Sequence, residues 1–292
     1  MAPKVVVITG CSTGIGLETA ALLASDKDNR FKVFATMRNL AKQSKLEIAA
    51  GSTLDKTLFI RELDVTKEDS ILRFIDKINR EEGGVDILIN NAGIGQVGLV
   101  EKVPMNQIRM VYETNVFGLI RLTQAVIPGM KSKRAGHIIN VSSMAGLFGF
   151  PFCDIYASSK FAVEGFSESI TPFLKKFNIS VSVIEPGPVQ TEFVANIAAN
   201  TSGNFWQFYK DSFVRSGKSP MSNYQTGAEI ARIIQDVILS DNPHLHYPTS
   251  EVMRNYAATK YIDPTGDSVI RRMTKQQQWK ENTNSIPPKS HL

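Results

Sequence analysis

The stretch that decides the fold is KVVVITGCSTGIG, Lys4–Gly16. Its β-branched start predicts a buried strand over Lys4–Thr9, and a helical pattern begins at Gly14. Gly10, Gly14 and Gly16 let the backbone turn tightly and approach a pyrophosphate, for which the helix N-terminus offers free N–H groups and partial positive charge. A plain glycine turn is the alternative, but the strand–loop–helix context favours a dinucleotide-binding loop.

Outward from this loop, short apolar runs alternate with longer helical patterns, as βαβ units do. Right-handed crossovers would wind these units into one open sheet. The predicted fold class is therefore α/β: a single-domain, Rossmann-like, doubly wound parallel sheet. The expected strands are Lys4–Thr9, Lys32–Met37, Thr57–Leu63, Val85–Ile89, Gly136–Ser142 and Ser180–Ile184. The expected helices are Gly14–Ser25, Lys67–Arg80, Met105–Lys131, Ile155–Phe177 and Gln225–Leu239.

The regular alternation ends near Glu185. Residues 192–225 are rich in Ser, Asn, Gly and aromatic side chains, and a segment of that length inside a compact domain is usually a lid or a binding element. From about residue 275 the chain is polar. We therefore expect one domain over 1–274 with a C-terminal substrate lid at 192–225, followed by a flexible polar tail over 275–292.

Composition excludes several classes of protein. With 42% hydrophobic and 21% charged residues, the chain is expected to be an ordinary globular protein. A formal charge of +5 without a dense Lys/Arg run argues against nucleic-acid binding. Two cysteines, Cys11 and Cys153, cannot build a disulfide framework, which favours a reducing compartment. The N-terminal apolar run is too short for a signal peptide, and no run reaches the ~20 apolar residues of a membrane span.

The end of the second strand bears on cofactor choice. An NAD-selective site carries an Asp or Glu there to hold the ribose 2′-hydroxyl, whereas this chain has Met37 and Arg38. A guanidinium can pair with a 2′-phosphate, and Ser12 can add a hydrogen bond. We therefore predict NADP(H), with a solvated surface arginine as the alternative. No metal site is predicted.

Tyr156 and Lys160 stand four residues apart on an expected helix, so they share one face. A free tyrosine, with a pKa of about 10, is a reluctant acid–base group at neutral pH. A nearby ammonium stabilises tyrosinate and is expected to lower that pKa. Ser143, at the end of the fifth strand, can stabilise charge on a substrate oxygen. Singly, these residues also suit ordinary packing roles.

Together these motifs resemble the short-chain dehydrogenase/reductase family. The resemblance rests on TGCSTGIG, NNAG at Asn90–Gly93, Asn115 in TNVFG, Ser143 in NVSSMAG, YxxxK at Tyr156 and Lys160, and PGPVQT at Pro186–Thr191. It implies a catalytic tetrad of Asn115, Ser143, Tyr156 and Lys160. Lys160 would also hold the nicotinamide ribose, and Asn115 would hold a water that relays protons from Lys160.

The resemblance further implies a set of cofactor contacts and a homodimer built on the helices around 105–131 and 155–177. The predicted cofactor-binding residues are Gly10, Ser12, Thr13, Gly14, Ile15, Gly16, Arg38, Asp64, Val65, Asn91, Ala92, Gly93, Tyr156, Lys160, Pro186, Gly187, Val189 and Thr191.

The substrate is predicted to be large and apolar, because aromatic residues surround the tetrad in the sequence. The candidate substrate-binding residues are Ser143, Leu147, Phe150, Phe152, Tyr156 and Phe193. Within the family the closer resemblance is to the retinol and 17β-hydroxysteroid dehydrogenases, and it rests on stretches such as KVFATMRNL, GLFGFPFCDIYASSKFAVEGFSES and DPTGD. The steroid enzymes of that group carry a lid histidine and a glutamate beyond DPxG. Here the lid has no histidine and Gln276 stands near the second position, so we favour a retinoid over a steroid.

Other functions and locations stay open. A chain with this fold can bind NADP(H) as a non-catalytic sensor or scaffold, but that reading predicts a broken tetrad. We expect a cytoplasmic protein, with peripheral membrane contact compatible with a lipophilic substrate. The C-terminal Ser-His-Leu at 290–292 is similar to a peroxisomal address, which gives the alternative location.

Overall fold

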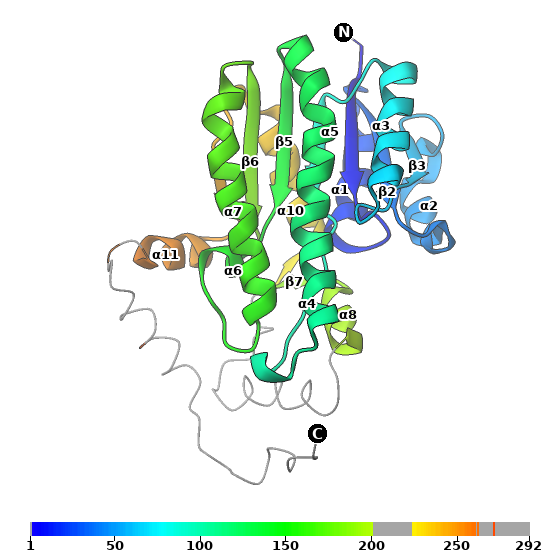
Figure 1. Cartoon of the computed structure of the whole chain (residues 1–292). Coiled ribbons are helices and arrows are strands. Elements are labelled where there is room, and N and C mark those ends of the chain that lie inside the picture. The colour runs from blue at the N-terminus through cyan, green and yellow to red at the C-terminus, as the bar shows by residue number, and fades with distance from the viewer. Residues whose placement is uncertain (1, 201–223, 261, 263–270, 272–292) are drawn as a thin grey trace.

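The structure is a computed structural model and describes residues 2–200, 224–260, 262 and 271. Seven parallel strands form one sheet in the order β3-β2-β1-β4-β5-β6-β9 (Figure 1). The strands are β1 (Lys4–Thr9), β2 (Phe31–Met37), β3 (Leu58–Glu62), β4 (Ile87–Asn90), β5 (Gly136–Val141), β6 (Ile179–Glu185) and β9 (His246–Pro248). The order reverses after β3, so the doubly wound prediction is confirmed.

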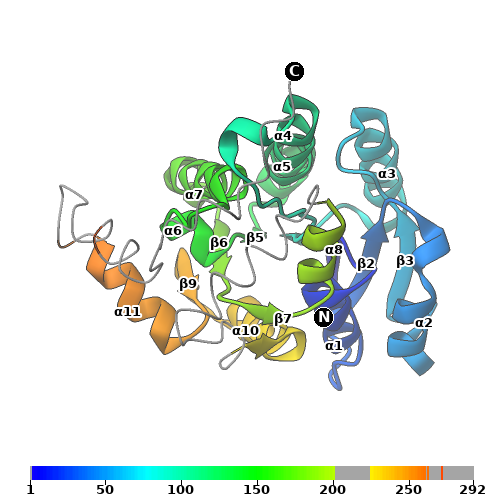
Figure 2. The same cartoon turned by 90° about the horizontal axis from the view of Figure 1, so that it is seen from below.

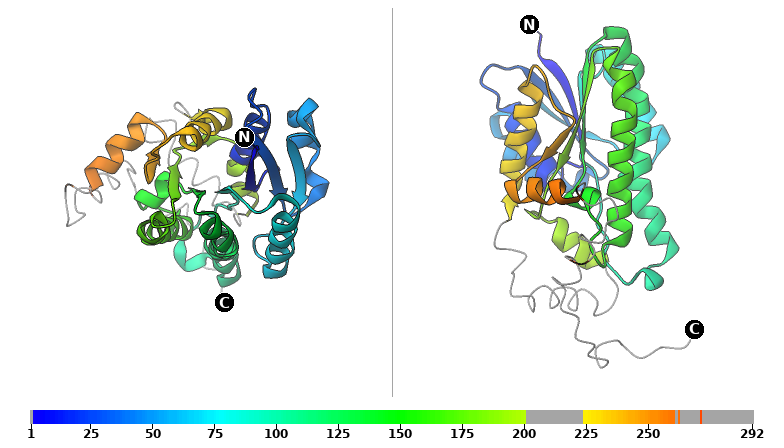
Figure 3. Two further views of the ribbon diagram at one scale, coloured as in Figure 1. Left: turned by 90° about the horizontal axis from the view of Figure 1, so that it is seen from above. Right: turned by 90° about the vertical axis from the view of Figure 1, so that its left-hand side faces the viewer.

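Helices cover both faces of the sheet, and alternation along β1 shows how the core is divided. Val6 and Ile8 pack with α1 and α10, whereas Val5 and Val7 pack with the opposite layer of α3, α5 and α7. The right-hand view of Figure 3 shows the sheet between these two layers. The helices are α1 (Gly14–Ala24), α2 (Ser44–Ala50), α3 (Glu68–Glu82), α4 (Met105–Tyr112), α5 (Gly118–Lys133), α6 (Met144–Leu147), α7 (Asp154–Lys175), α8 (Phe193–Asn200), α10 (Gly227–Leu239) and α11 (Glu251–Lys260).

The six strands expected from the sequence are all present, with ends that shift by at most two residues. The sequence analysis missed β9, which is only three residues long and pairs with β6 at the edge of the sheet. It also missed the two-residue strands β7 (Val189–Gln190) and β8 (Gln225–Thr226), which pair with each other. Elements this short carry no periodic signal in the sequence.

The predicted single helix over Met105–Lys131 is wrong in one respect. A π-helical segment, Glu113–Phe117, separates α4 from α5. The wider turn buries Asn115, whose side chain bonds to the loop after β4 instead of facing solvent. Such π-segments are rare and are frequent at functional sites, which a period of 3.6 residues cannot reveal.

A buried polar chain ties the centre of the sheet to the helices. The Asn90 amide on β4 donates to Asn140 on β5 at 2.9 Å and to Thr123 on α5 at 3.1 Å. The Asn140 amide in turn donates to Ser167 on α7 at 2.8 Å. Satisfied buried amides of this kind fix register, because any slip would leave them unpaired at a cost of about 1–3 kcal/mol each.

The predicted lid over 192–225 lies only partly within the described residues. It begins with α8, which lies below the carboxyl ends of the central strands in Figure 1 and in front of them in Figure 2, the view from below. Residues 201–223 lie outside the described residues, as does the predicted tail over 275–292. The lid and the tail therefore stay predictions. In the described part of the chain, every helix is too short or too polar to cross a membrane.

The close approach of α1 to the loop after β4 generates a stability prediction. A Cβ on Gly16 would lie 2.4 Å from Asn91 Nδ2 and 2.6 Å from the Gly10 carbonyl oxygen. We expect Gly16→Ala to lower the free energy of unfolding by about 1–3 kcal/mol through overpacking. Gly129→Ala is the matched control, because nothing lies within 4 Å of a Cβ there. Denaturant unfolding compares the two, and equal stabilities would contradict the packing argument.

Candidate active site

The glycine loop has the geometry of a phosphate cradle. Gly10 and Gly14 have φ values of +73° and +62°, which favour glycine. A Cβ on Gly10 would lie 2.9 Å from the Ala92 Cα, so the loop and the NNAG segment touch backbone to backbone. Thr9 reinforces this contact, because its hydroxyl accepts from the Asn91 and Ala92 N–H groups at 3.0 and 2.9 Å.

Asn91 braces the same loop. Its amide nitrogen donates to the carbonyl oxygens of Thr9 at 2.8 Å and Gly10 at 3.2 Å. Thr13, the N-cap of α1, makes no capping hydrogen bond with its side chain. The first N–H groups of α1 therefore lack a side-chain cap beside the glycine turn, and a bound pyrophosphate would accept from such N–H groups. A dinucleotide fits these residues.

The end of β2 lies beside the loop, since the Cys11 N–H donates to the Thr36 carbonyl at 2.9 Å. Arg38, two residues further on, is exposed. Ser12 and Arg38 thus follow the two backbone segments that this hydrogen bond joins, and their contact with an adenosine ribose stays a prediction. Met37 is buried in the core.

The remaining predicted cofactor residues come from three other strand ends. Thr191 follows β7 and lies over the loop, 3.2 Å from a Cβ built on Gly14. Pro186 follows β6, and its carbonyl accepts from the Met144 N–H at 2.8 Å. Asp64 follows β3 and uses Oδ1 to accept from the Thr66 N–H and hydroxyl. Val65 is buried against Gly118 at the start of α5.

Ser143 and Tyr156 meet at the end of β5. Ser143 is the N-cap of α6, and its hydroxyl oxygen accepts from the Ala145 N–H at 3.1 Å. A hydrogen bond joins the side chains of Ser143 and Tyr156. Phe193 of α8 packs on the Tyr156 ring with the ring centroids 5.6 Å apart.

Lys160 lies one turn after Tyr156 on α7, as its spacing predicts. Its Nζ is 5.8 Å from the Tyr156 ring centroid and donates to the Val141 carbonyl at 2.8 Å. The side chain is buried, and Gly93 lies beside it, since a Cβ there would be 3.6 Å from Nζ. The ammonium therefore stands between the tyrosine and the NNAG segment.

Asn115 is the fourth member of the predicted tetrad. Its Oδ1 accepts from the Ile94 N–H at 2.8 Å, and its Nδ2 donates to the Ile94 carbonyl at 2.9 Å. Nδ2 also donates to the Ser159 hydroxyl at 3.0 Å. Asn115 thus fixes the backbone after NNAG, a structural task that the sequence analysis did not foresee. The predicted water relay stays a proposal.

Burial sets the titration of the two central groups. It raises the pKa of the Tyr156 hydroxyl above its ordinary value, and the hydrogen bond from Ser143 only partly opposes this. Burial also lowers the pKa of Lys160 to about 8, against the attraction of Glu164. The expected lowering of the Tyr156 pKa by Lys160 is thus not seen in this structure, in which burial is the largest influence and raises that pKa.

The candidate substrate residues fall into two groups. Phe193 packs directly on Tyr156, and with Ile197 it covers Gly95, where a Cβ would lie 2.5–2.8 Å from these two side chains. Leu147 and Phe150 instead pack with Phe148 and Ala257, beside α11. Phe152 is buried and has a φ of +69°, which is strained for an aromatic residue. The aromatic lid stretch at 204–213 lies outside the described residues.

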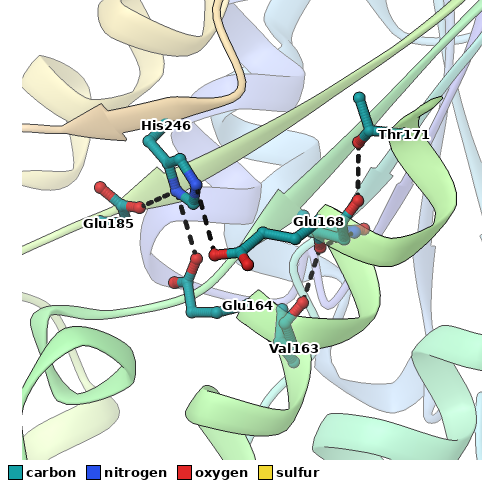
Figure 4. A network of polar contacts seen from close by, with 8 residues as sticks. Val163, Glu164, Glu168, Thr171, Glu185 and His246 are labelled. Carbon is teal, nitrogen blue, oxygen red and sulfur yellow. Dashed lines mark hydrogen bonds and ion pairs between the residues drawn. The ribbon is translucent and has the colours of Figure 1, made fainter. Parts of the chain in front are cut away.

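Two groups of polar residues near the site were missed from the sequence. Ser159, which bonds Asn115, precedes Lys160 and has no spacing signal of its own. Glu164, Glu185 and His246 converge from α7, β6 and β9 (Figure 4). His246 Nδ1 lies 2.7 Å from Glu185 Oε1, the distance of a hydrogen bond, so the three side chains form an ion-paired cluster. The prediction of no metal stays a prediction.

Comparisons with known proteins agree with this geometry. The model of the short chain dehydrogenase family matches residues 4–202. Retinol dehydrogenase 8 of Bos taurus is 41% identical over 279 residues, covering 92% of this chain and 89% of that protein. The 17-beta-hydroxysteroid dehydrogenase type 1 of Homo sapiens is 34% identical over 292 residues, covering 94% and 86%.

A solved structure described as ElxO with NADP bound has a TM-score of 0.71 and 27% identity, and covers 84% of this chain and 96% of that chain. The glycine loop against NNAG, the Ser143–Tyr156 hydrogen bond and the buried Lys160 are thus found in a chain whose relatives span nearly its whole length. This oxidoreductase chain belongs to the short-chain dehydrogenase family.

Proposed function

We propose that the chain is an NADP(H)-dependent oxidoreductase that interconverts a lipophilic alcohol and its carbonyl compound, with all-trans-retinol and all-trans-retinal as the first candidates. The observation that carries the proposal is the meeting of Ser143, Tyr156 and Lys160 beside the glycine loop. That arrangement unites a proton donor, an oxyanion partner and a cation. A non-catalytic sensor, the alternative from another class, would not need it.

In the proposed reduction, a bound nicotinamide supplies the hydride. Tyr156 donates its hydroxyl proton to the substrate oxygen as negative charge develops there, and its raised pKa keeps it protonated at neutral pH. Ser143 donates a hydrogen bond to the same oxygen. Lys160, beside the ring, stabilises the tyrosinate that remains. Oxidation of the alcohol uses the same groups in reverse.

NADP(H) preference is supported by Arg38 and by the absence of a carboxylate at the end of β2. The exposed guanidinium can form a bidentate pair with a 2′-phosphate at little desolvation cost. The relative ElxO, described with NADP bound, is consistent with this choice.

The retinoid proposal is supported by the higher identity to the retinol dehydrogenase, 41% against 34% for the steroid enzyme. The absence of a lid histidine and the presence of Gln276 also argue against the steroid alternative, although both positions lie outside the described residues. Phe193 on Tyr156 supports an apolar substrate of either class.

We also propose a homodimer through α4, α5 and α7. Phe117 is exposed and lines a hollow together with Ile108 and Tyr112. Met110 on α4 and Phe161 and Phe173 on α7 are also exposed. Exposed apolar surface of this kind suits association. A cytoplasmic location with peripheral membrane contact is likewise proposed, and the alternative address at 290–292 lies outside the described residues.

Removing the Tyr156 hydroxyl tests the reaction. We expect Tyr156→Phe to reduce kcat at least ~10²-fold while cofactor affinity is kept, because only the proton donor is lost. Retinal reduction and NADPH fluorescence titration measure the two properties. Tyr112→Phe, which removes a surface hydroxyl bonded to Ser158, is the matched control. Retained turnover in Tyr156→Phe would refute the role.

Arg38→Gln tests the cofactor. We expect the KM for NADPH to rise about tenfold or more and that for NADH to stay unchanged, because a charge-assisted pair is worth roughly 1.5–3 kcal/mol. Lys42→Gln, four residues on and also exposed, is the control. The KM values for NADPH and NADH are measured in parallel for each variant. An equal rise in the KM for NADH would contradict the assignment. Met37 is unsuitable for this test, since an Asp there would bury a carboxylate in the core.

The substrate class is tested by side-by-side turnover of all-trans-retinal and estrone with NADPH. We expect a higher kcat/KM for retinal, because the steroid's far hydroxyl lacks polar partners in this sequence. Faster reduction of estrone would reverse the ranking. Failure with both compounds, together with normal NADPH binding, would favour a different lipophilic carbonyl or the sensor alternative.

A further inference from the structure

One face of α7 carries a charge that the proposed reaction does not yet use. Tyr156, Lys160 and Glu164 stand at i, i+4 and i+8, so Glu164 lies directly behind Lys160 as seen from the tyrosine. Glu164 is 5% exposed, as is Lys160. A carboxylate so deeply buried is rare unless it has a task or a partner.

The surroundings of Glu164 leave its charge weakly compensated by hydrogen bonds. Among the residues that the structure describes, neither carboxylate oxygen has a hydrogen-bond partner, and the nearby buried Ser142 hydroxyl has none either. Both groups crowd the α6 turn, because a Cβ on Gly146 would lie 2.9 Å from Glu164 Oε1 and 2.6 Å from Ser142 Oγ. The carboxylate is thus fixed beneath the turn that begins at Ser143. A charge without local hydrogen bonds acts strongly on its charged neighbours in a low dielectric.

His246 holds Glu164 from the other side. Its Nδ1 lies 3.5 Å from Glu164 Oε2 and 2.7 Å from Glu185 Oε1, and its Nε2 lies 3.6 Å from Glu168 Oε1 (Figure 4). Glu164 and Glu185 raise the pKa of His246 to about 10. A raised pKa means that the imidazole stays protonated through neutral pH and loses its proton only near that value. His246 is therefore a constant cation across the working range.

The charged groups follow one another with alternating sign: Lys160 positive, Glu164 negative, His246 positive and Glu185 negative. Lys160, Glu164 and Glu185 are buried, whereas His246 is exposed. Glu168, at the rim, is half exposed and adds a screened charge. The row runs from the tetrad to the end of β6, directly before Pro186. Glu164 is the buried charge with a positive group on either side, Lys160 and His246, and such opposite charges offset part of the desolvation cost of a buried ion.

We propose that Glu164 is a positioning residue that keeps the buried Lys160 side chain in its ammonium form, with His246 fixing the carboxylate in place. The inference deepens the proposed function and rests on it, because Lys160 assists Tyr156 only as a cation. Burial pushes Lys160 toward the neutral amine, and the Glu164 carboxylate opposes that push from the same helix face. The Val141 carbonyl supplies a hydrogen bond to Nζ but no full charge.

The test changes only the charge at Glu164. Glu164→Gln keeps the shape of the side chain, and Glu164→Asp keeps the charge on a shorter one. Glu168→Gln is the matched control, since it makes the same change one turn later at the half-exposed rim, against the same histidine. Thermal unfolding first establishes that each full-length variant is folded.

The direct readout is the titration of Lys160 by NMR of protein labelled at lysine Cε, with the Lys160 signal identified by its loss in Lys160→Arg. We expect its midpoint to fall by about one pH unit or more in Glu164→Gln, and to stay near the native value in Glu164→Asp and Glu168→Gln. An unchanged midpoint in folded Glu164→Gln would overturn the proposal, as would an equal fall in Glu168→Gln.

A second readout is the pH profile of kcat/KM for carbonyl reduction with NADPH. The alkaline limb should move to lower pH in Glu164→Gln alone, because Lys160 then loses its proton earlier. A uniform loss of rate without movement of the limb would indicate a merely structural role and would overturn the proposal. The NMR titration needs no turnover, so absence of reductase activity would refute the proposed function while leaving the Glu164 effect measurable.

Discussion

The contact between the ends of β1 and β4 is the constraint on which the candidate site depends. Asn91 donates two hydrogen bonds to Thr9 there, and Gly10 approaches Ala92 so closely that no Cβ fits. Because β4 also pairs with β5, the same contact sets how far the glycine loop lies from the serine, tyrosine and lysine beyond β5. Asn115 continues the chain of fixed backbone by binding Ile94. The phosphate-binding loop and the reacting groups are thus both held at the carboxyl ends of the parallel strands, as in other open α/β sheets.

Burial works in opposite directions on the two groups at the centre of that edge. It raises the pKa of Tyr156, which preserves a proton to give, and it lowers the pKa of Lys160, which endangers the cation beside it. A buried tyrosine–lysine pair therefore needs a further charged group nearby, so that the lysine stays protonated and can stabilise the tyrosinate. Glu164 supplies negative charge on the lysine side, and an oxidised nicotinamide supplies positive charge on the tyrosine side when it is bound.

Sequence reasoning located the strands and the tetrad because both leave regular marks. Buried parallel strands are continuous apolar runs, and Tyr156 and Lys160 keep the helical spacing of four residues. It failed where the structure departs from regular periods: at the π-helical segment that buries Asn115, and at β9, which is three residues long. It also gave the wrong direction for the pKa shift of Tyr156, because burial of a hydroxyl cannot be inferred from the identity of its neighbours along the chain. His246 was passed over for the same reason, since Glu164 and Glu185 are far from it in sequence.

The edge strand β9 shows how such a short element can still be well determined. Three residues pair with β6, too few to specify register by backbone bonds alone. The His246 imidazolium adds a side-chain constraint, because a slip of one residue would turn it to the other face of the sheet and leave two buried carboxylates facing each other. The cost of that unpaired charge, several kcal/mol for a buried pair, exceeds the net value of a few ladder bonds. The ionic cluster therefore fixes the edge of the sheet, and through Glu164 the same cluster reaches the lysine of the candidate site.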